Sequence, residues 1–188
     1  MNSMKQSLGA LTVAIRILKN GGIVICPTDT VYGFLADATN KKAVEKIYNI
    51  KKRPKSKPLP VFVKDFKMAN TLADVDARQA KMLKKYWPGK YTFILKRKLG
   101  HKLYGVDKKT IALRIPNYKF LNNILEKINR SLVQTSVNIS GENPFTAIDD
   151  IVKTFGSLDI LIIDGGDIKK RKSSKVLDLT TNKIKILR

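Results

Sequence analysis

The sequence predicts an α/β fold in which helices pack on an open, mixed and twisted β-sheet. Apolar residues at helical spacing alternate along the chain with short, β-branched apolar runs. Polar clusters directly follow several of those runs, as they do where strands of a sheet end at a ligand site. With 188 residues, and roughly 150 residues per domain as a guide, we expect a single domain over residues 1–188.

The first two elements are a helix and a buried strand. Four apolar residues between positions 8 and 18 fall at helical spacing, and Asn20-Gly21-Gly22 ends this helix. The run 23–26, Ile-Val-Ile-Cys, is rich in β-branched residues and stops at Pro27. We therefore expect a buried strand that leads directly into a polar loop.

The rest of the chain continues the alternation. Asn40 is a suitable N-cap for a second helix, which stops before Pro54. Strands are predicted at 59–63, 91–95, 111–115, 132–135, 160–163, 176–179 and 184–187, helices at 79–86, 120–128 and 148–155, and a turn at 87–89. The segments 100–109 and 165–175, rich in lysine and glycine, are candidate mobile loops.

The charge balance points to an anionic partner. Lysine and arginine total 37 against 15 acidic residues, which gives a formal net charge of +22. Nucleic acid, nucleotides, other polyphosphates and anionic lipid would all suit a field of that sign. The alternative for most individual lysines, including those in the run 169–172, is a solvated surface with no specific partner.

Several familiar site types are missing from the sequence. There is no phosphate-binding GxxxxGK[ST] loop, no GxGxxG and no cysteine or histidine spacing typical of a metal site, so we expect no protein-bound metal. His101, the only histidine, fits a solvated loop better than a catalytic triad, and Cys26 fits a buried apolar residue better than a reactive thiol. The single cysteine and the lack of any targeting or membrane segment favour the cytoplasm.

Three polar clusters could carry chemistry. The loop 27–33 offers hydroxyls, a carboxylate and a phenol after a strand, and it fits either a small polar ligand or a capped turn. The segment 51–59 is a cationic loop stiffened by prolines, which fits either a phosphate clamp or a solvated surface. In an extended backbone, Lys51 and Arg53 would project to the same side.

The third cluster follows the predicted strand 132–135. Ser136 and Asn138 would lie on one side of an extended backbone and offer a hydroxyl and an amide to one ligand, and the alternative is an Asx-turn with a helix cap. Arg114 lies inside an apolar strand, opposite to its apolar neighbours. A buried arginine needs a partner, which is either a protein carboxylate or an anionic ligand.

Taken together, these segments resemble the YrdC-like family. The matching pieces are 22–33 (GIVICPTDTVYG), Lys51 and Arg53-Pro54 with 57–59 (KPL), 87–89 (WPG), 114–116 (RIP), Ser136 and Asn138 with Gly141, and 164–166 (DGG) followed by 174–179 (SKVLDL). They occur in the order of the family and cover roughly residues 21–180. The resemblance implies an open α/β fold with a basic concave surface, in the short, single-domain form of the family.

The resemblance also implies an activity. It implies a nucleotidyltransferase that makes threonylcarbamoyl-AMP and pyrophosphate from L-threonine, bicarbonate or CO2 and ATP, for threonylcarbamoyladenosine modification of tRNA. Mg²⁺ would arrive with ATP. Implied partners are the downstream threonylcarbamoyl-transfer proteins and, as direct contacts, tRNA or double-stranded RNA. The alternatives are an RNA-binding protein without catalysis and a family paralogue that adenylates another substrate.

The family pattern assigns residues to roles. Its Lys, Arg, Ser and Asn tetrad falls on Lys51, Arg53, Ser136 and Asn138, which the resemblance implies are catalytic. The same residues except Arg53 are expected at the nucleotide, together with Lys57, Arg114 and Ser174, and the threonine side is expected at Thr30, Tyr32 and Arg53. One departure is Lys175, which follows Ser174 where relatives commonly have threonine.

Overall fold

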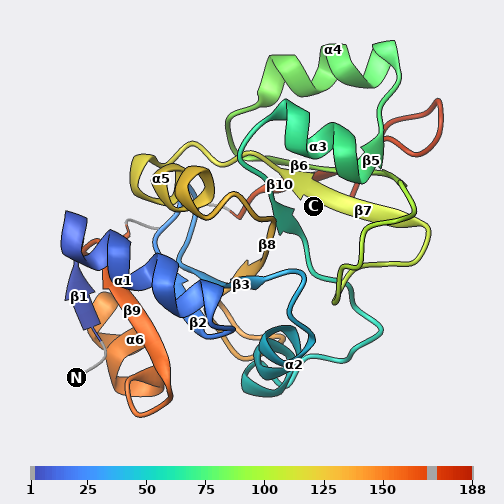
Figure 1. Cartoon of the computed structure of the whole chain (residues 1–188). Helices are drawn as coiled ribbons and strands as arrows, with labels where there is room; N and C mark the ends of the chain where they lie inside the picture. The colour runs from blue at the N-terminus through green and yellow to red at the C-terminus, as the bar shows by residue number, and fades with distance from the viewer. Residues whose placement is uncertain (1–2, 169–172, 188) are drawn as a thin grey trace.

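A mixed β-sheet runs through the protein, whose computed structural model describes residues 3–168 and 173–187 (Figure 1). Its strands are β1 (Ser3–Lys5), β2 (Ile23–Cys26), β3 (Gly33–Asp37), β4 (Val61–Phe62), β5 (Ala73–Asp74), β6 (Tyr91–Arg97), β7 (Thr110–Arg114), β8 (Leu132–Ser136), β9 (Ile160–Asp164), β10 (Lys175–Asp178) and β11 (Lys185–Ile186). The helices are α1 (Leu8–Lys19), α2 (Lys41–Ile50), α3 (Phe66–Leu72), α4 (Ala77–Tyr86), α5 (Lys119–Ile128) and α6 (Ile148–Phe155).

The order of strands brings distant segments together. Across the sheet it is β1-β9-β2-β3-β8-β4-β7-β6-β10-β11, with β5 paired to β6. β2 is parallel to β9 and antiparallel to β3, and β3 is in turn antiparallel to β8. The register places Gly33 opposite Ser136. The loop after β2 and the end of β8 therefore lie at the same edge of the sheet.

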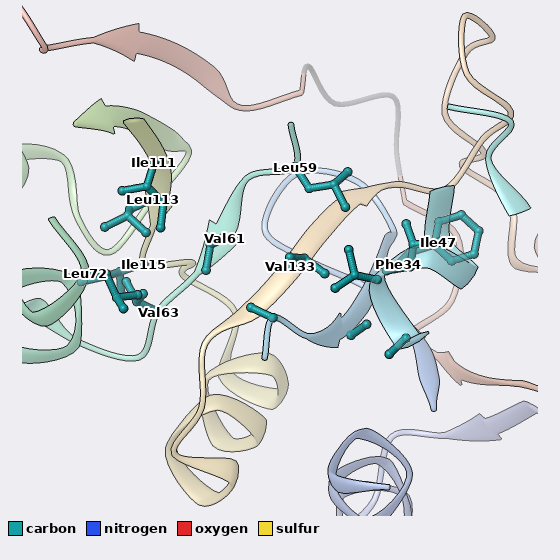
Figure 2. Close-up of a cluster of buried hydrophobic side chains, with 14 of the residues drawn as sticks. Phe34, Ile47, Leu59, Val61, Val63, Leu72, Ile111, Leu113, Ile115 and Val133 are labelled. Carbon is teal, nitrogen blue, oxygen red and sulfur yellow. The ribbon is translucent and has the colours of Figure 1, made fainter. Parts of the chain in front are cut away.

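Both faces of the sheet are buried. In β2, Ile23 and Ile25 belong to one apolar cluster while Val24 and Cys26 belong to the other, as alternation along a strand requires. Helices α1 and α5 cover the second cluster, and α2 and α6 contribute to the first. Figure 2 shows part of the first cluster, with Val61 and Val133 from adjacent strands. Burial on both faces explains why β2 is apolar at every position.

The predicted elements agree with the structure in most places. The predicted helix starting after Asn40 is α2, and the Asn40 side chain accepts a hydrogen bond from the amide of Ala43, as an N-cap does. The predicted strand 59–63 is shorter and covers only Val61–Phe62. The sequence patterns missed β1, β3, β5 and α3. Each is short, and β1 exists because it pairs with β9, far along the chain.

One local prediction was wrong. Residues 51–53 do not form an extended segment, because Lys51 caps the end of α2 in a helical conformation and Lys52 has a positive φ of 50°. The side chains of Lys51 and Arg53 still line one cavity, as described below. The predicted loop 100–109 is a loop, and the backbone amide of Tyr104 anchors it by donating to the carbonyl oxygen of Ala38. The basic run 169–172 lies outside the described residues.

Leu35 tests the importance of the sheet core. It is 0% exposed in the cluster between β3 and the helices α1 and α5, so Leu35→Ala should lower the free energy of unfolding by about 2–5 kcal/mol. Leu8→Ala is the control, because Leu8 is 81% exposed and its loss should change stability by less than about 0.5 kcal/mol. Urea unfolding followed by the fluorescence of Trp87 measures both. Equal effects would contradict this assignment of the core.

Candidate active site

A cavity of about 480 Å³ opens where the loop after β2, the loop after α2 and the end of β8 meet. Most of the residues predicted from the sequence line it. These are Thr30, Lys51, Arg53, Arg114, Ser136, Asn138 and Ser174. Tyr32 and Lys57 are not among the described residues that line it. The fold thus gathers residues from five separate segments of the chain into one site.

Lys51 is the most deeply buried cation of the predicted tetrad. It is 2% exposed, and its ammonium donates to the carbonyl oxygens of Ser136 (2.5 Å) and Asn138 (2.8 Å) and to Asn138 Oδ1 (2.7 Å). These three acceptors match the three N–H donors of a lysine. The Nζ also lies 5.8 Å from the ring centroid of Phe34. Lys51 therefore ties the end of α2 to the turn after β8.

Burial also changes the acidity of Lys51. Loss of hydration lowers its pKa to about 8, and the positive charge of nearby Arg53 acts in the same direction. Below that pH the ammonium form prevails, which keeps all three donors available to the carbonyl and amide oxygens around it.

Asn138 completes the network around this lysine. Its Oδ1 accepts from Lys51 and from the hydroxyl of Ser136 (2.7 Å), and its Nδ2 donates to the carbonyl oxygens of Ile139 and Glu142. Both the oxygen and the two N–H groups of the amide are therefore used inside the protein. The side chains of Ser136 and Asn138 contact each other, but β8 ends at Ser136, so the two residues do not lie along one extended strand. The structure also gives Asn138 the turn-forming role that was its alternative.

Arg53 lies at the cavity with part of its hydrogen-bonding capacity used. Its Nε and Nη2 donate to the carbonyl oxygens of Lys57 (3.0 Å) and Pro58 (3.1 Å). These bonds account for two of the five N–H donors of an arginine and orient the guanidinium plane. The proline-stiffened loop thus holds a cation at the cavity.

The buried Arg114 pairs with a protein carboxylate. Its Nη2 donates to Asp29 Oδ1 (2.5 Å), Nε donates to the carbonyl of Gly89 (2.9 Å) and Nη1 donates to Thr30 Oγ1 (3.3 Å). Both members of the ion pair are nearly inaccessible, so each compensates the charge of the other. A Cβ at Gly89 would lie 2.7 Å from the carbonyl oxygen of Tyr86, which favours glycine in this turn.

The remaining predicted residues have clear positions. Ser174 is 4% exposed, lines the cavity and lies 3.1 Å, oxygen to oxygen, from the hydroxyl of Thr92. Tyr32 is fully buried, and its hydroxyl accepts from the amide of Gly165 and donates to the carbonyl of Gly166. Burial raises the pKa of Tyr32 to about 12. Lys57 is exposed, and its carbonyl oxygen accepts the bond from Arg53.

Sequence reasoning missed several contributors to the site. Asp29 was noted as a carboxylate in its loop, but its partner was not. The sequence carries a signal for this pair, because a buried arginine needs a partner for its charge, and Asp29 is an acidic residue in a loop that follows a buried strand. Thr110, Gln134 and Glu142 also line the cavity, and no local pattern in the sequence marked them.

Cys26 and His101, which we expect to take no part in the chemistry, do not line the cavity. Cys26 is 0% exposed, burial raises the pKa of its thiol, and its Sγ lies 3.4 Å from the carbonyl oxygen of Pro27. His101 is an exposed loop residue. Within residues 3–168 and 173–187, no group of three or more histidine, cysteine or acidic side chains could hold a metal ion.

Helix length bears on membrane insertion. In the described part of the chain, none of the helices has the length and apolar character needed to span a bilayer.

The fold and the site define an α/β protein whose cavity sets cations among neutral hydrogen-bond donors, an arrangement that suits an anionic ligand. Comparison with known proteins makes this specific. The sequence profile of the Sua5/YciO/YrdC family, described as telomere recombination, matches residues 16–188, and the chain belongs to this family. The predicted resemblance is confirmed.

Two curated relatives have names that refer to the same activity. A protein of Methanocaldococcus jannaschii, provisionally named a threonylcarbamoyl-AMP synthase, is 40% identical over 165 residues, which are 88% of this chain and 78% of the relative. A threonylcarbamoyl-AMP synthase of Pyrococcus abyssi is 32% identical over 172 residues, 90% of this chain. The chain spans about half, 51%, of the length of the Pyrococcus protein.

A solved structure supports the fold assignment. The crystal structure of Pyrococcus abyssi Sua5 complexed with L-threonine matches with a TM-score of 0.86 and 28% identity. The match covers 99% of this chain and 56% of that one. The predicted α/β architecture with a mixed sheet is confirmed, and the basic concave surface stays a prediction.

The acidity of Lys51 can be measured directly. Its side-chain NMR signal should titrate near pH 8, whereas an unperturbed lysine has a pKa of about 10.4. Between these values the unfolded chain binds a proton that the folded chain has lost, so the contribution of Lys51 makes stability rise with pH over this window. Lys51→Arg identifies the signal by its disappearance. Titration of this signal near the unperturbed value would refute the assignment.

Proposed function

We propose that this chain forms threonylcarbamoyl-AMP and pyrophosphate from L-threonine, bicarbonate or CO2 and ATP, for the modification of tRNA. The observation that carries the proposal is the cavity itself, which gathers Arg53, Arg114, Ser136 and Ser174 around buried Lys51. The names of the two curated relatives and the threonine complex of the Pyrococcus protein support it.

The chemistry suits such a site. In the proposed sequence, the amine of threonine captures CO2 as a carbamate, and a carbamate oxygen then attacks the α-phosphorus of ATP. The bond from that phosphorus to the bridging oxygen breaks, and pyrophosphate leaves. Two anions must approach each other in this step. Cations and neutral donors lower that barrier by positioning and charge stabilisation, with no strong general base required.

We assign the charged groups by their hydrogen bonds. Arg53 keeps N–H donors beyond its two carbonyl bonds, and we place it against the carbamate and the phosphates. All three N–H donors of the Lys51 ammonium bond to protein oxygens, so Lys51 contributes positive charge and holds the turn after β8 in place. Arg114 and Thr30, bonded to each other, form the opposite part of the proposed substrate site.

Ser136, Asn138 and Ser174 complete the proposed nucleotide side. The Ser136 hydroxyl donates to Asn138 in this structure, and rotation about its C–O bond would redirect it to a phosphate oxygen. Tyr32 supports the site indirectly, because its hydroxyl bonds to the backbone of Gly165 and Gly166 and so fixes the loop after β9. Mg²⁺ enters as part of the MgATP substrate, held by phosphate oxygens and water.

Substrate dependence tests the proposed reaction. Purified protein with MgATP should release pyrophosphate only when threonine and bicarbonate are both present, and mass spectrometry should detect the adenylate. Release that needs neither co-substrate would refute the proposal. A folded protein that binds RNA and releases no pyrophosphate would favour the alternative of RNA binding without catalysis.

Arg53 tests the site assignment. Arg53→Ala should lower threonine-dependent turnover at least about tenfold, because loss of a positioned charged hydrogen bond costs over about 1.4 kcal/mol. Arg16→Ala is a matched control, since Arg16 is an exposed arginine on α1 that does not line the cavity. Pyrophosphate release measures both. Unchanged turnover in the Arg53 variant would refute its role.

A further inference from the structure

Gln134 brings a buried amide into the active-site cavity. It lies on β8, is 9% exposed and lines the cavity. Side chains two residues apart along a strand lie on the same face, and Ser136, two residues later, lines the cavity as well. Leu132, two residues earlier, belongs to the apolar cluster that α1 and α5 cover. This face of β8 therefore passes from the core to the cavity at Gln134.

The side-chain amide of Gln134 has hydrogen-bonding groups that the protein does not use. It forms no hydrogen bond to any other group within residues 3–168 and 173–187. An amide offers two donors and an acceptor, and leaving them unpaired in a buried position costs free energy. Gln79, which is 7% exposed, shows the opposite arrangement, because its Oε1 accepts from the amide of Asp76 and its Nε2 donates to the carbonyl of Leu179. The amide of Gln134 is thus available to a bound ligand.

The Gln134 amide lies beside the loop that follows β2. A Cβ built on Gly33 would lie 3.7 Å from Gln134 Oε1 and 3.7 Å from Thr28 Cγ2. The hydroxyl oxygens of Thr28 and Thr30 are 3.0 Å apart, and Thr30 Oγ1 accepts from Nη1 of Arg114. Gln134 therefore lies at the end of the cavity that Thr30 lines, which is where threonine is expected.

We propose that Gln134 binds the side-chain hydroxyl of the threonine substrate and so determines which amino acid is used. This role rests on the proposed function. The carboxylate and the phosphates are anions, which suit Arg53, and the amine becomes the carbamate. The hydroxyl is the neutral polar group of threonine that remains. It can donate to Oε1 and accept from Nε2 of a single amide.

Selectivity should follow from this contact. A site that binds a substrate hydroxyl by hydrogen bonds rejects the analogue without it by about 10⁴–10⁵, because the polar group of the site is left unpaired, whereas a missing methylene changes the rate only about 10–200-fold. L-2-aminobutyrate is threonine without the hydroxyl, and L-serine is threonine without the methyl group. We expect L-2-aminobutyrate to be the poorer substrate of the two.

Gln134→Met tests the role of the amide, because methionine is similar in length and cannot form these hydrogen bonds. The measurement is kcat/KM of the full chain for threonine and for L-2-aminobutyrate, followed by pyrophosphate release. The ratio of the two values does not depend on the fraction of folded protein, so a loss of stability alone does not move it. In Gln134→Met the ratio should fall at least about tenfold, through weaker use of threonine.

Gln79→Met is the matched control. It removes an equally buried amide that bonds only within the protein and does not line the cavity. This variant should keep the ratio of the unaltered protein, even if it is less stable. An equal fall of the ratio in both variants would overturn the role of Gln134, because selectivity would then follow stability.

The remaining outcomes separate this role from the proposed reaction. An unchanged ratio in an active Gln134→Met variant, or a change confined to the KM for ATP, overturns the role and leaves the reaction standing. If the unaltered protein releases no pyrophosphate, the reaction fails, and calorimetric titration with the two amino acids tests Gln134 separately. A preference for threonine that Gln134→Met abolishes supports the role, and the absence of such a preference overturns it.

Discussion

The burial of one ammonium group constrains the site more than any other interaction. Lys51 can lie 2% exposed only if the protein supplies acceptors for all its donors, and the end of β8 and the turn after it supply them. That requirement fixes where α2 ends and how the turn 136–140 is folded, and the amide of Ser140 returns a bond to the carbonyl of Lys51. The shape of the cavity depends on this contact.

The sequence predicted which residues line the cavity better than it predicted the contacts that each of them makes. Apolar periodicity located α2 and β8, and polar clusters at their ends located Lys51 and Ser136, because such clusters are local features of the chain. What Lys51 bonds to depends on β3 pairing with β8, which no local pattern reveals. Tyr32 shows the same limit. Its bonds to the amide of Gly165 and the carbonyl of Gly166 depend on the pairing of β2 with β9, which its local sequence does not reveal, and its place at threonine stays a prediction.

Two cavities lie on either side of the loop 51–59. On one side, the carbonyl oxygens of Lys57 and Pro58 orient Arg53 at the active-site cavity, and on the other side Lys55 and Pro58 line a second cavity, of about 510 Å³, beside α2. A ligand in that second cavity would contact the same short segment that sets the position of Arg53. Such an arrangement can couple two sites if the ligand favours one loop position over another.

Cys26 has a practical consequence for experiments in solution. It is the only cysteine of the chain, it is 0% exposed between β2 and the helices α1 and α5, and burial disfavours its thiolate. The thiolate is the nucleophile that attacks alkylating reagents, so the native protein should resist maleimide, whereas a protein whose sheet core has opened should react. A cysteine introduced at the surface could carry a spectroscopic label without removal of the native one. The same thiol, left in place, would report the rate at which this core opens.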